Sequence, residues 1–94
     1  MRHRGSTYWS WADFQLPTES YEETRDDGTK IDVQARISRT GGTQLFLGLY
    51  NEAGHPTVEE YYDNVPGENV ARALKVGMKR AAELAAGMSE PLQI

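Results

Sequence analysis

The 94-residue chain contains no cysteine and no long apolar run. Without cysteine, disulfide bonds and thiolate metal sites are excluded, and a reducing, cytoplasmic location is expected. No segment approaches the roughly 20 apolar residues that cross a membrane, so we expect no membrane contact. Residues 1–6 are basic, but no apolar segment follows them. We therefore expect no secretory signal there and a disordered start.

An excess of positive charge is also absent. The chain carries 14 acidic and 10 basic side chains, for a formal net charge of -4. Up to Val65 there are eleven acidic and six basic side chains, and from Pro66 onward there are three and four. Because nonspecific nucleic-acid binding depends on lysine and arginine at phosphates, this charge disfavours a nucleic-acid partner without forbidding a local basic face.

Recognisable catalytic motifs are missing as well. We find no nucleophile elbow, no phosphate-binding glycine loop and no serine, histidine and aspartate set. No spacing typical of metal ligands surrounds His3 or His55. Asp26-Asp27-Gly28 and Gly41-Gly42 are typical of turns. The sequence therefore predicts a protein that is not an enzyme and that holds no metal and no cofactor.

What is present is a single domain over residues 1–94, with its clearest strand at Lys30 to Arg39. This segment alternates strictly, and its apolar side carries Ile31, Val33, Ala35 and Ile37. A turn at 40–43 leads into a return strand, 44–50, whose leucines share that apolar side.

The remaining strands are less regular, and together they define a β-meander within residues 7–63. The aromatic run from Thr7 to Leu16 favours a strand. Residues 18–25 are polar and acidic, which fits either an exposed loop or an edge strand. Residues 57–63 form another strand, at an edge of the sheet because of its acidic residues and the preceding Pro56.

The last strong pattern is an amphipathic helix over residues 66–88, followed by a tail at 89–94. Gly77 and Ala81 leave the middle of its apolar side almost bare, so the sheet can approach the helix backbone closely. Pro66 and Glu68 suit the first turn, and Gly87 suits the end. Apolar residues recur at spacings of four and three, which keeps them on one side of the helix: Val70, Leu74, Gly77, Ala81, Leu84 and Met88.

The predicted fold is therefore α+β: an antiparallel β-meander of three to four strands with one long C-terminal helix packed across one face. A single covering helix leaves the other face open. Aromatic side chains interleaved with arginine gather there, where they can anchor a protein partner or stack bases. The alternatives are a homodimer interface and plain cross-strand packing. The candidate binding residues are Trp9, Trp11, Arg36, Phe46, Tyr50 and Tyr61, although the pattern does not decide whether Tyr61 or Tyr62 faces the core.

Charged side chains form two further candidate surfaces. Arg72, Lys75 and Lys79, with Arg80 alongside, lie on the polar side of the helix, where a solvated face is a simpler interpretation than a phosphate-binding stripe. Acidic side chains gather on the last strand and near the first hairpin: Glu59, Glu60 and Asp63, and Glu19, Glu22, Glu23, Asp26 and Asp27.

The strands at 44–50 and 57–63, followed by a helix from Val70 to Ala86, resemble two nucleic-acid-binding families. One is the integrase-arm type, a three-stranded sheet with a C-terminal helix. The other is the double-stranded RNA-binding domain, whose last helix also follows a β-meander. The resemblance implies a sheet-plus-helix fold and nucleic-acid binding. The RNA-binding family opens that helix with a lysine cluster, where this chain has Pro66-Gly67-Glu68-Asn69, and the integrase arm has a basic sheet, where this chain is acidic.

Three functional hypotheses follow. The first is a small noncatalytic protein-interaction module that forms a homodimer or binds a protein partner through the aromatic face. The second is a nucleic-acid-binding domain that uses Trp9, Trp11, Arg36 and the basic residues of the helix. The third is a small acidic inhibitor or immunity-type protein that occupies a basic site on its target.

Overall fold

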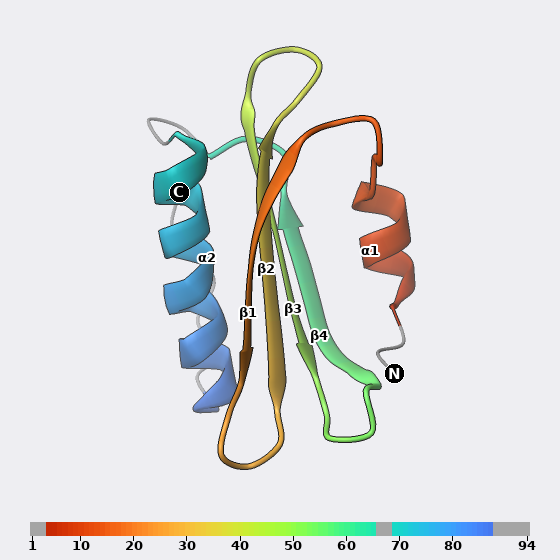
Figure 1. The fold of residues 1–94 in the computed structure, drawn as a ribbon, viewed down its shortest axis with the longest axis vertical. Coiled ribbons are helices and arrows are strands. Elements are labelled where there is room, and N and C mark those ends of the chain that lie inside the picture. Colours follow the sequence, from red (N-terminus) through yellow and green to blue (C-terminus); the bar gives the residue numbers. More distant parts are fainter. Residues whose placement is uncertain (1–3, 66–68, 88–94) are drawn as a thin grey trace.

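The computed structural model describes residues 4–65 and 69–87, and it shows one sheet between two helices (Figure 1). The strands are antiparallel and follow the order β1-β2-β3-β4. This arrangement confirms the predicted α+β class, with a meander of four strands and a C-terminal helix of 16 residues against one face. The elements are α1 (Ser6–Trp11), β1 (Thr18–Thr24), β2 (Lys30–Ile37), β3 (Thr43–Tyr50), β4 (Pro56–Tyr62) and α2 (Val70–Ala85).

The hairpin turns lie where glycine predicts them. Gly28, Gly41 and Gly54 have φ of 88°, 91° and 90°, a left-handed conformation that side chains rarely adopt. For residues 18–25 the sequence allowed either a loop or an edge strand, and the structure shows the edge strand β1 there. Its Tyr21 lies opposite Val33 of β2. β4 forms the other edge of the sheet, as expected.

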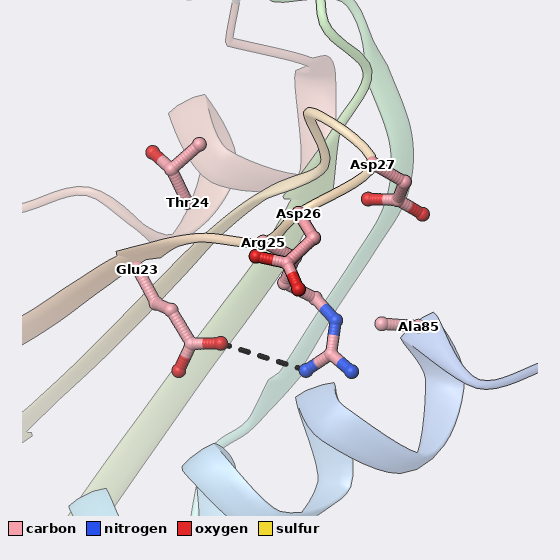
Figure 2. A pocket seen from close by; sticks show the side chains of 6 residues that line it. All are labelled: Glu23, Thr24, Arg25, Asp26, Asp27 and Ala85. Atoms are coloured by element: carbon pink, nitrogen blue, oxygen red, sulfur yellow. Dashed lines mark hydrogen bonds and ion pairs between the residues drawn. The ribbon is translucent and has the colours of Figure 1, made fainter.

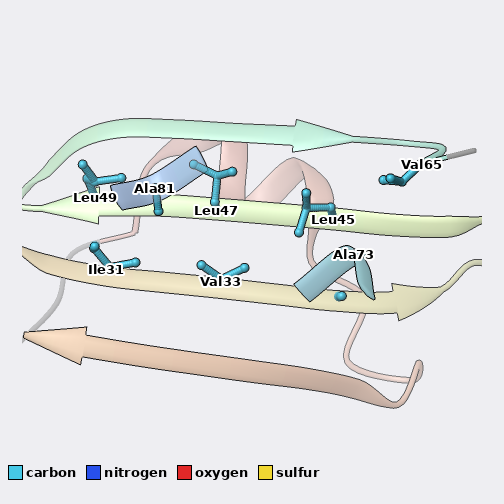
Figure 3. Packing of buried hydrophobic residues seen from close by; sticks show 9 residues of the cluster. Ile31, Val33, Leu45, Leu47, Leu49, Val65, Ala73 and Ala81 are labelled. Carbon is cyan, nitrogen blue, oxygen red and sulfur yellow. The ribbon is translucent and has the colours of Figure 1, made fainter. Parts of the chain in front are cut away.

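The main core lies between α2 and the sheet (Figure 3). Val33 and Leu45 are fully buried beneath Gly77, which lacks a side chain in the middle of the predicted apolar side of the helix. Tyr62 packs against this core, whereas Tyr61 is 45% exposed and lies opposite Phe46 in the register of β3 and β4. Ile37 corrects one expectation, because at the end of β2 it is 45% exposed rather than part of the core.

The ends of α2 follow ordinary capping rules. The side chain of Asn69 accepts a hydrogen bond of 2.9 Å from the backbone N–H of Arg72, which satisfies one of the free donors of the first turn. After the helix, Gly87 adopts a φ of 88°. The predicted roles of Pro66, Glu68, Met88 and the tail 89–94 lie outside the described residues.

The predicted strand from Thr7 to Leu16 is wrong, because the chain forms the short helix α1 there. Tyr8 and Trp11 are three residues apart, so a helix turns both toward the sheet, whereas a strand would send them to opposite faces. Both are buried in this position, at 8% and 5% exposure. Of residues 1–6, which were expected to be disordered, Arg4, Gly5 and Ser6 lie in or directly before this helix.

Candidate functional site

Helix α1 covers the face of the sheet that was expected to be open (Figure 1). The ring of Phe46 is fully buried, 5.2 Å from the ring of Tyr8 and 5.5 Å from that of Trp11. The Tyr8 ring meets Phe46 edge-on, an arrangement that aromatic rings favour. This small second core corrects the premise that one helix leaves the aromatic face uncovered.

A carboxylate on β4 holds the start of α1. Glu59 accepts hydrogen bonds from the backbone N–H groups of Gly5 (3.0 Å) and Tyr8 (3.2 Å). These donors belong to the first turn of a helix, where intrahelical acceptors are lacking and negative charge is favourable. Glu59 therefore acts as a cap supplied from another element, and its partners lie 54 and 51 residues away in sequence.

The same carboxylate joins a buried polar network. Tyr50 donates to Glu59 over 2.9 Å and accepts from Arg4 over 3.0 Å, and Arg4 also pairs with the buried Asp32. Burial raises the pKa of the Tyr50 phenol far above its usual value; Glu59 adds to this effect and Arg4 opposes it. The phenol thus stays a proton donor. Sequence patterns could not reveal this network, because Arg4 reaches partners 28 and 46 residues away.

Arg36 is the buried cation beside the second core, at 6% exposure. Its Nε donates to Gln44 Oε1 over 2.7 Å, its Nη2 donates to the Trp11 carbonyl over 2.6 Å, and its guanidinium lies 3.7 Å from the centre of the Trp11 ring. Burial lowers the pKa of Arg36, while the more distant Asp13 and Asp63 act in the opposite direction. Its Nη1 and the indole Nε1 of Trp11 have no hydrogen-bond partner within the described chain.

The exposed aromatic surface lies on the other side of α1. Trp9 is 58% exposed and Phe14 is 80% exposed, and their ring centres are 6.3 Å apart. We call these two residues the aromatic pair. Phe14 was not among the predicted site residues, although it ends the same aromatic run as Trp9. Its place beside Trp9 depends on α1, which sequence reasoning missed.

The structure divides the predicted site residues among three environments. Trp11, Arg36 and Phe46 meet beneath α1, and Tyr50 belongs to the buried network. Trp9 and Tyr61 remain exposed.

The basic side of α2 differs from the predicted stripe in one residue. Arg72, Lys75 and Lys79 are exposed. Arg80, in contrast, is 5% exposed and forms an ion pair of 3.0 Å with Glu60. Arg80 therefore ties α2 to β4 and is not part of a solvent-facing stripe.

Acidic side chains remain accessible around β1 and the turn that follows it. Figure 2 shows a hollow where this turn faces the end of α2, lined by Glu23, Arg25, Asp26, Asp27 and Ala85 among others. Arg25 forms an ion pair of 3.5 Å with Glu23 and so supplies part of the countercharge. Glu59 and Glu60 on β4 are held in internal contacts, whereas Asp63 directly after β4 is exposed. The predicted acidic surface on this strand is therefore reduced to Asp63, and the larger acidic surface lies on the β1 side.

Other kinds of site find no support within ranges 4–65 and 69–87. No three histidine, aspartate or glutamate side chains gather there as a metal-binding group. Neither described helix is long and apolar enough to cross a membrane.

No protein-family model, no curated protein and no solved structure matches this chain.

Proposed function

We propose that the protein is a small noncatalytic interaction module, expected in the cytoplasm, that binds a protein partner through the aromatic pair. The observation that carries this proposal is that Trp9 and Phe14 leave 58% and 80% of their surface exposed while their rings remain in contact. Tryptophan and phenylalanine are enriched in protein interfaces, and exposed apolar patches mark contact sites. The proposed surface thus lies on the outer side of α1 and not on the sheet face beneath it.

The size of the pair favours a short segment of another protein over a second copy of this chain. A buried aromatic side chain contributes about 150–250 Å². Two of them supply roughly 300–500 Å², well below the roughly 800 Å² per partner of a stable interface. A peptide-sized partner, which needs a small anchored contact, fits this area better than a permanent homodimer.

Selection from a displayed library of short random peptides tests this proposal. We expect peptides enriched on the wild-type protein to lose binding to the double variant Trp9→Ala/Phe14→Ala. The control is Lys75→Ala/Lys79→Ala, which alters exposed side chains on α2, across the sheet from the pair. Light scattering is run alongside. A dimer that depends on Trp9 and Phe14 would show that the surface binds a second copy of the chain. Peptide binding that is unchanged in the double variant would overturn the proposal.

A second candidate function is binding to a basic site on a target through β1, as expected of an acidic inhibitor. Glu19 and Glu22 are exposed on this edge strand, and Asp26 and Asp27 are exposed in the turn beside it. The test is the quadruple change of these residues to glutamine or asparagine. Loss of binding to a lysine-rich peptide would favour this function, and unchanged binding would remove it.

The nucleic-acid alternative has less support from this geometry. Trp11, Arg36, Phe46 and Tyr50 are buried, so they offer no platform on which bases can stack. Binding of single-stranded DNA and RNA at low salt tests the alternative directly. A complex that weakens steeply as salt rises would revive it.

A further inference from the structure

Strand β1 forms one edge of the sheet, and the outer side of its backbone has no strand beside it. No further strand among residues 4–65 and 69–87 pairs with it, and the two helices lie on opposite faces of the sheet (Figure 1). Five of its 7 residues are exposed, so this edge is open to solvent. An edge of this kind can take up an extended segment of another chain as an additional strand.

The hydrogen bonds of the first hairpin show which backbone groups of β1 face outward. The N–H of Arg25 donates to the carbonyl of Thr29 over 2.8 Å. Because hydrogen-bonded and non-hydrogen-bonded pairs alternate along an antiparallel ladder, the preceding residue, Thr24, belongs to a pair without these bonds. The same holds at every second residue back along the strand, including Ser20 and Thr18. The N–H and C=O groups of these residues therefore point away from β2, where an added strand would bond to them.

Two carboxylates flank a tyrosine on the α2 side of this edge. Tyr21 packs against the main core, and because side chains alternate between the faces of a sheet, Glu19 and Glu23 lie on the same side. Glu19 is exposed. Glu23 accepts a hydrogen bond of 2.6 Å from the Tyr21 hydroxyl and forms an ion pair of 3.5 Å with Arg25. Since an exposed ion pair of this kind is weak, Arg25 leaves part of the negative charge of Glu23 open to another cation.

These side chains specify what an added strand would carry. Its residues opposite Glu19 and Glu23 would lie four apart on the α2 side, with the residue midway between them opposite Tyr21. Opposite charges attract across neighbouring strands, and a β-branched side chain packs well on an aromatic one. We propose that β1 binds an extended segment of a partner protein as an additional antiparallel strand, and that this segment carries lysine or arginine four residues apart with a β-branched apolar residue midway. The inference rests on the second candidate function, the binding of a basic target through β1, and not on the aromatic pair.

A second copy of this chain and the other edge of the sheet both fit this kind of pairing less well. Two β1 strands paired about Tyr21 would place Glu19 of one copy opposite Glu23 of the other, and each copy carries a net charge of -4. At the other edge, β4 begins at Pro56, which has no N–H to donate, and its Glu59 holds the start of α1. The edge at β1 and a basic partner therefore fit each other best.

Nuclear magnetic resonance of the ¹⁵N-labelled full chain with short peptides tests the proposal. The probe is the acetylated and amidated peptide Thr-Lys-Thr-Val-Thr-Lys-Thr at low salt. We expect it to slow hydrogen exchange at the backbone amides of Ser20 and Thr24, because they become bonded, and to leave the amides of β4 unchanged. A peptide of the same composition with its lysines three residues apart places them on opposite faces of the strand. It should bind about two- to fivefold more weakly, and equal affinity would overturn the proposed spacing.

Backbone N-methylation of the probe separates strand pairing from charge attraction. In the proposed register, the N–H of the threonine after valine faces β1, whereas the N–H of valine itself faces away. Methylation of this threonine should abolish the protection of the Ser20 amide, and methylation of valine, which leaves the same charge, should preserve it. Equal binding of the two methylated peptides would overturn the added strand while the second candidate function stands.

Variants of the protein locate the contact. Glu19→Gln should weaken binding of the probe by about two- to fivefold, as loss of an exposed ion pair does, whereas Asp63→Asn removes an exposed charge beyond β4 and should bind as the parent does. Trp9→Ala/Phe14→Ala should also bind the probe unchanged, so failure of the aromatic pair and failure at β1 are separate results. Loss of binding in that double variant, or no protection of Ser20 by the probe, would overturn the inference. A parent dimer that the probe dissociates would assign the edge to a second copy and overturn it as well.

Discussion

Gly77 is the residue at which α2 comes closest to the sheet. A Cβ placed there would lie 2.5 Å from Val33 Cγ1 and 2.7 Å from Leu45 Cδ1, well inside van der Waals contact. The two neighbours are fully buried, so they have little room to move. Because glycine has no side chain, it allows the backbone of α2 to approach the sheet closely here, despite its poor helix propensity.

Replacement of Gly77 should therefore cost stability through overpacking. We expect Gly77→Leu to lower the free energy of unfolding by about 1–3 kcal/mol or more, as insertions into packed cores do. The control is Ala71→Leu on the exposed side of the same helix, which should change stability by less than about 0.5 kcal/mol. Urea denaturation measures both. Equal stability of Gly77→Leu and the parent would contradict the close contact.

Glu60 should make the stability of the fold depend on acid pH. Burial acts to raise its pKa, but hydrogen bonds from Arg80 and Tyr62 together with the charge of Arg80 outweigh burial, so the pKa is lowered from its ordinary value of 4.5. A carboxyl with a lowered folded-state pKa contributes stability above its unfolded value, and this contribution is lost as the pH falls through the folded value.

The variant Glu60→Gln tests this dependence. We expect the parent to be more stable than the variant near neutral pH, and the gap to shrink as the pH falls below 4.5. Thermal unfolding at a series of pH values provides the measurement. The exposed Glu52→Gln is the control and should leave the profile unchanged. A gap that stays constant across the acid range would rule out the role assigned to Glu60.

At the scale of secondary-structure elements, α1 is the one described element whose type could not be predicted from the sequence. β2 and β3 follow from local alternation, and α2 follows from its helical spacing, so the sheet and its main covering helix were expected. A six-residue helix is too short to be stable alone and depends on tertiary contacts. Its contacts come from Glu59 and Phe46, far away in sequence.

The error at α1 carried over to the candidate site. Alternation correctly gathered Arg36 and Phe46 on one face, but whether that face is open depends on what covers it. Phe46 is fully buried because α1 lies over it, and Phe14 is exposed beside Trp9 because the helix ends between them. The sequence could therefore show which residues share a face of the sheet, whereas the burial of these residues could be known only from the position of α1.

The two tryptophans of α1 should differ sharply in their effect on stability. Trp11 is 5% exposed against Phe46, so Trp11→Ala should cost about 3–5 kcal/mol, as large-to-small changes in cores do. Trp9 is 58% exposed, and Trp9→Ala should cost less than about 0.5 kcal/mol. Chemical denaturation of both variants measures the difference. Equal costs would mean that α1 does not pack on the sheet as described.

At the scale of the whole molecule, β1 and β4 are the two edge strands of the sheet, and neither pairs with a further strand among residues 4–65 and 69–87. An open edge offers unpaired backbone groups to a second copy, and charged side chains are a common defence. On β1, Glu19, Glu22 and Glu23 would bring like charges together if two copies paired edge to edge. The chain is therefore expected to be a monomer, which agrees with a partner that is a segment of another protein.

Removal of these charges should allow two copies of the chain to associate through their β1 edges. We expect the triple variant Glu19→Gln/Glu22→Gln/Glu23→Gln to form dimers or larger species at concentrations where the parent stays monomeric, as measured by light scattering after size exclusion. The control, Glu52→Gln/Asp63→Asn/Glu83→Gln, removes the same charge away from β1, so a general loss of repulsion would affect both variants equally. Association of the triple variant alone would show that the β1 carboxylates protect the edge, and a triple variant that stays monomeric would contradict this role.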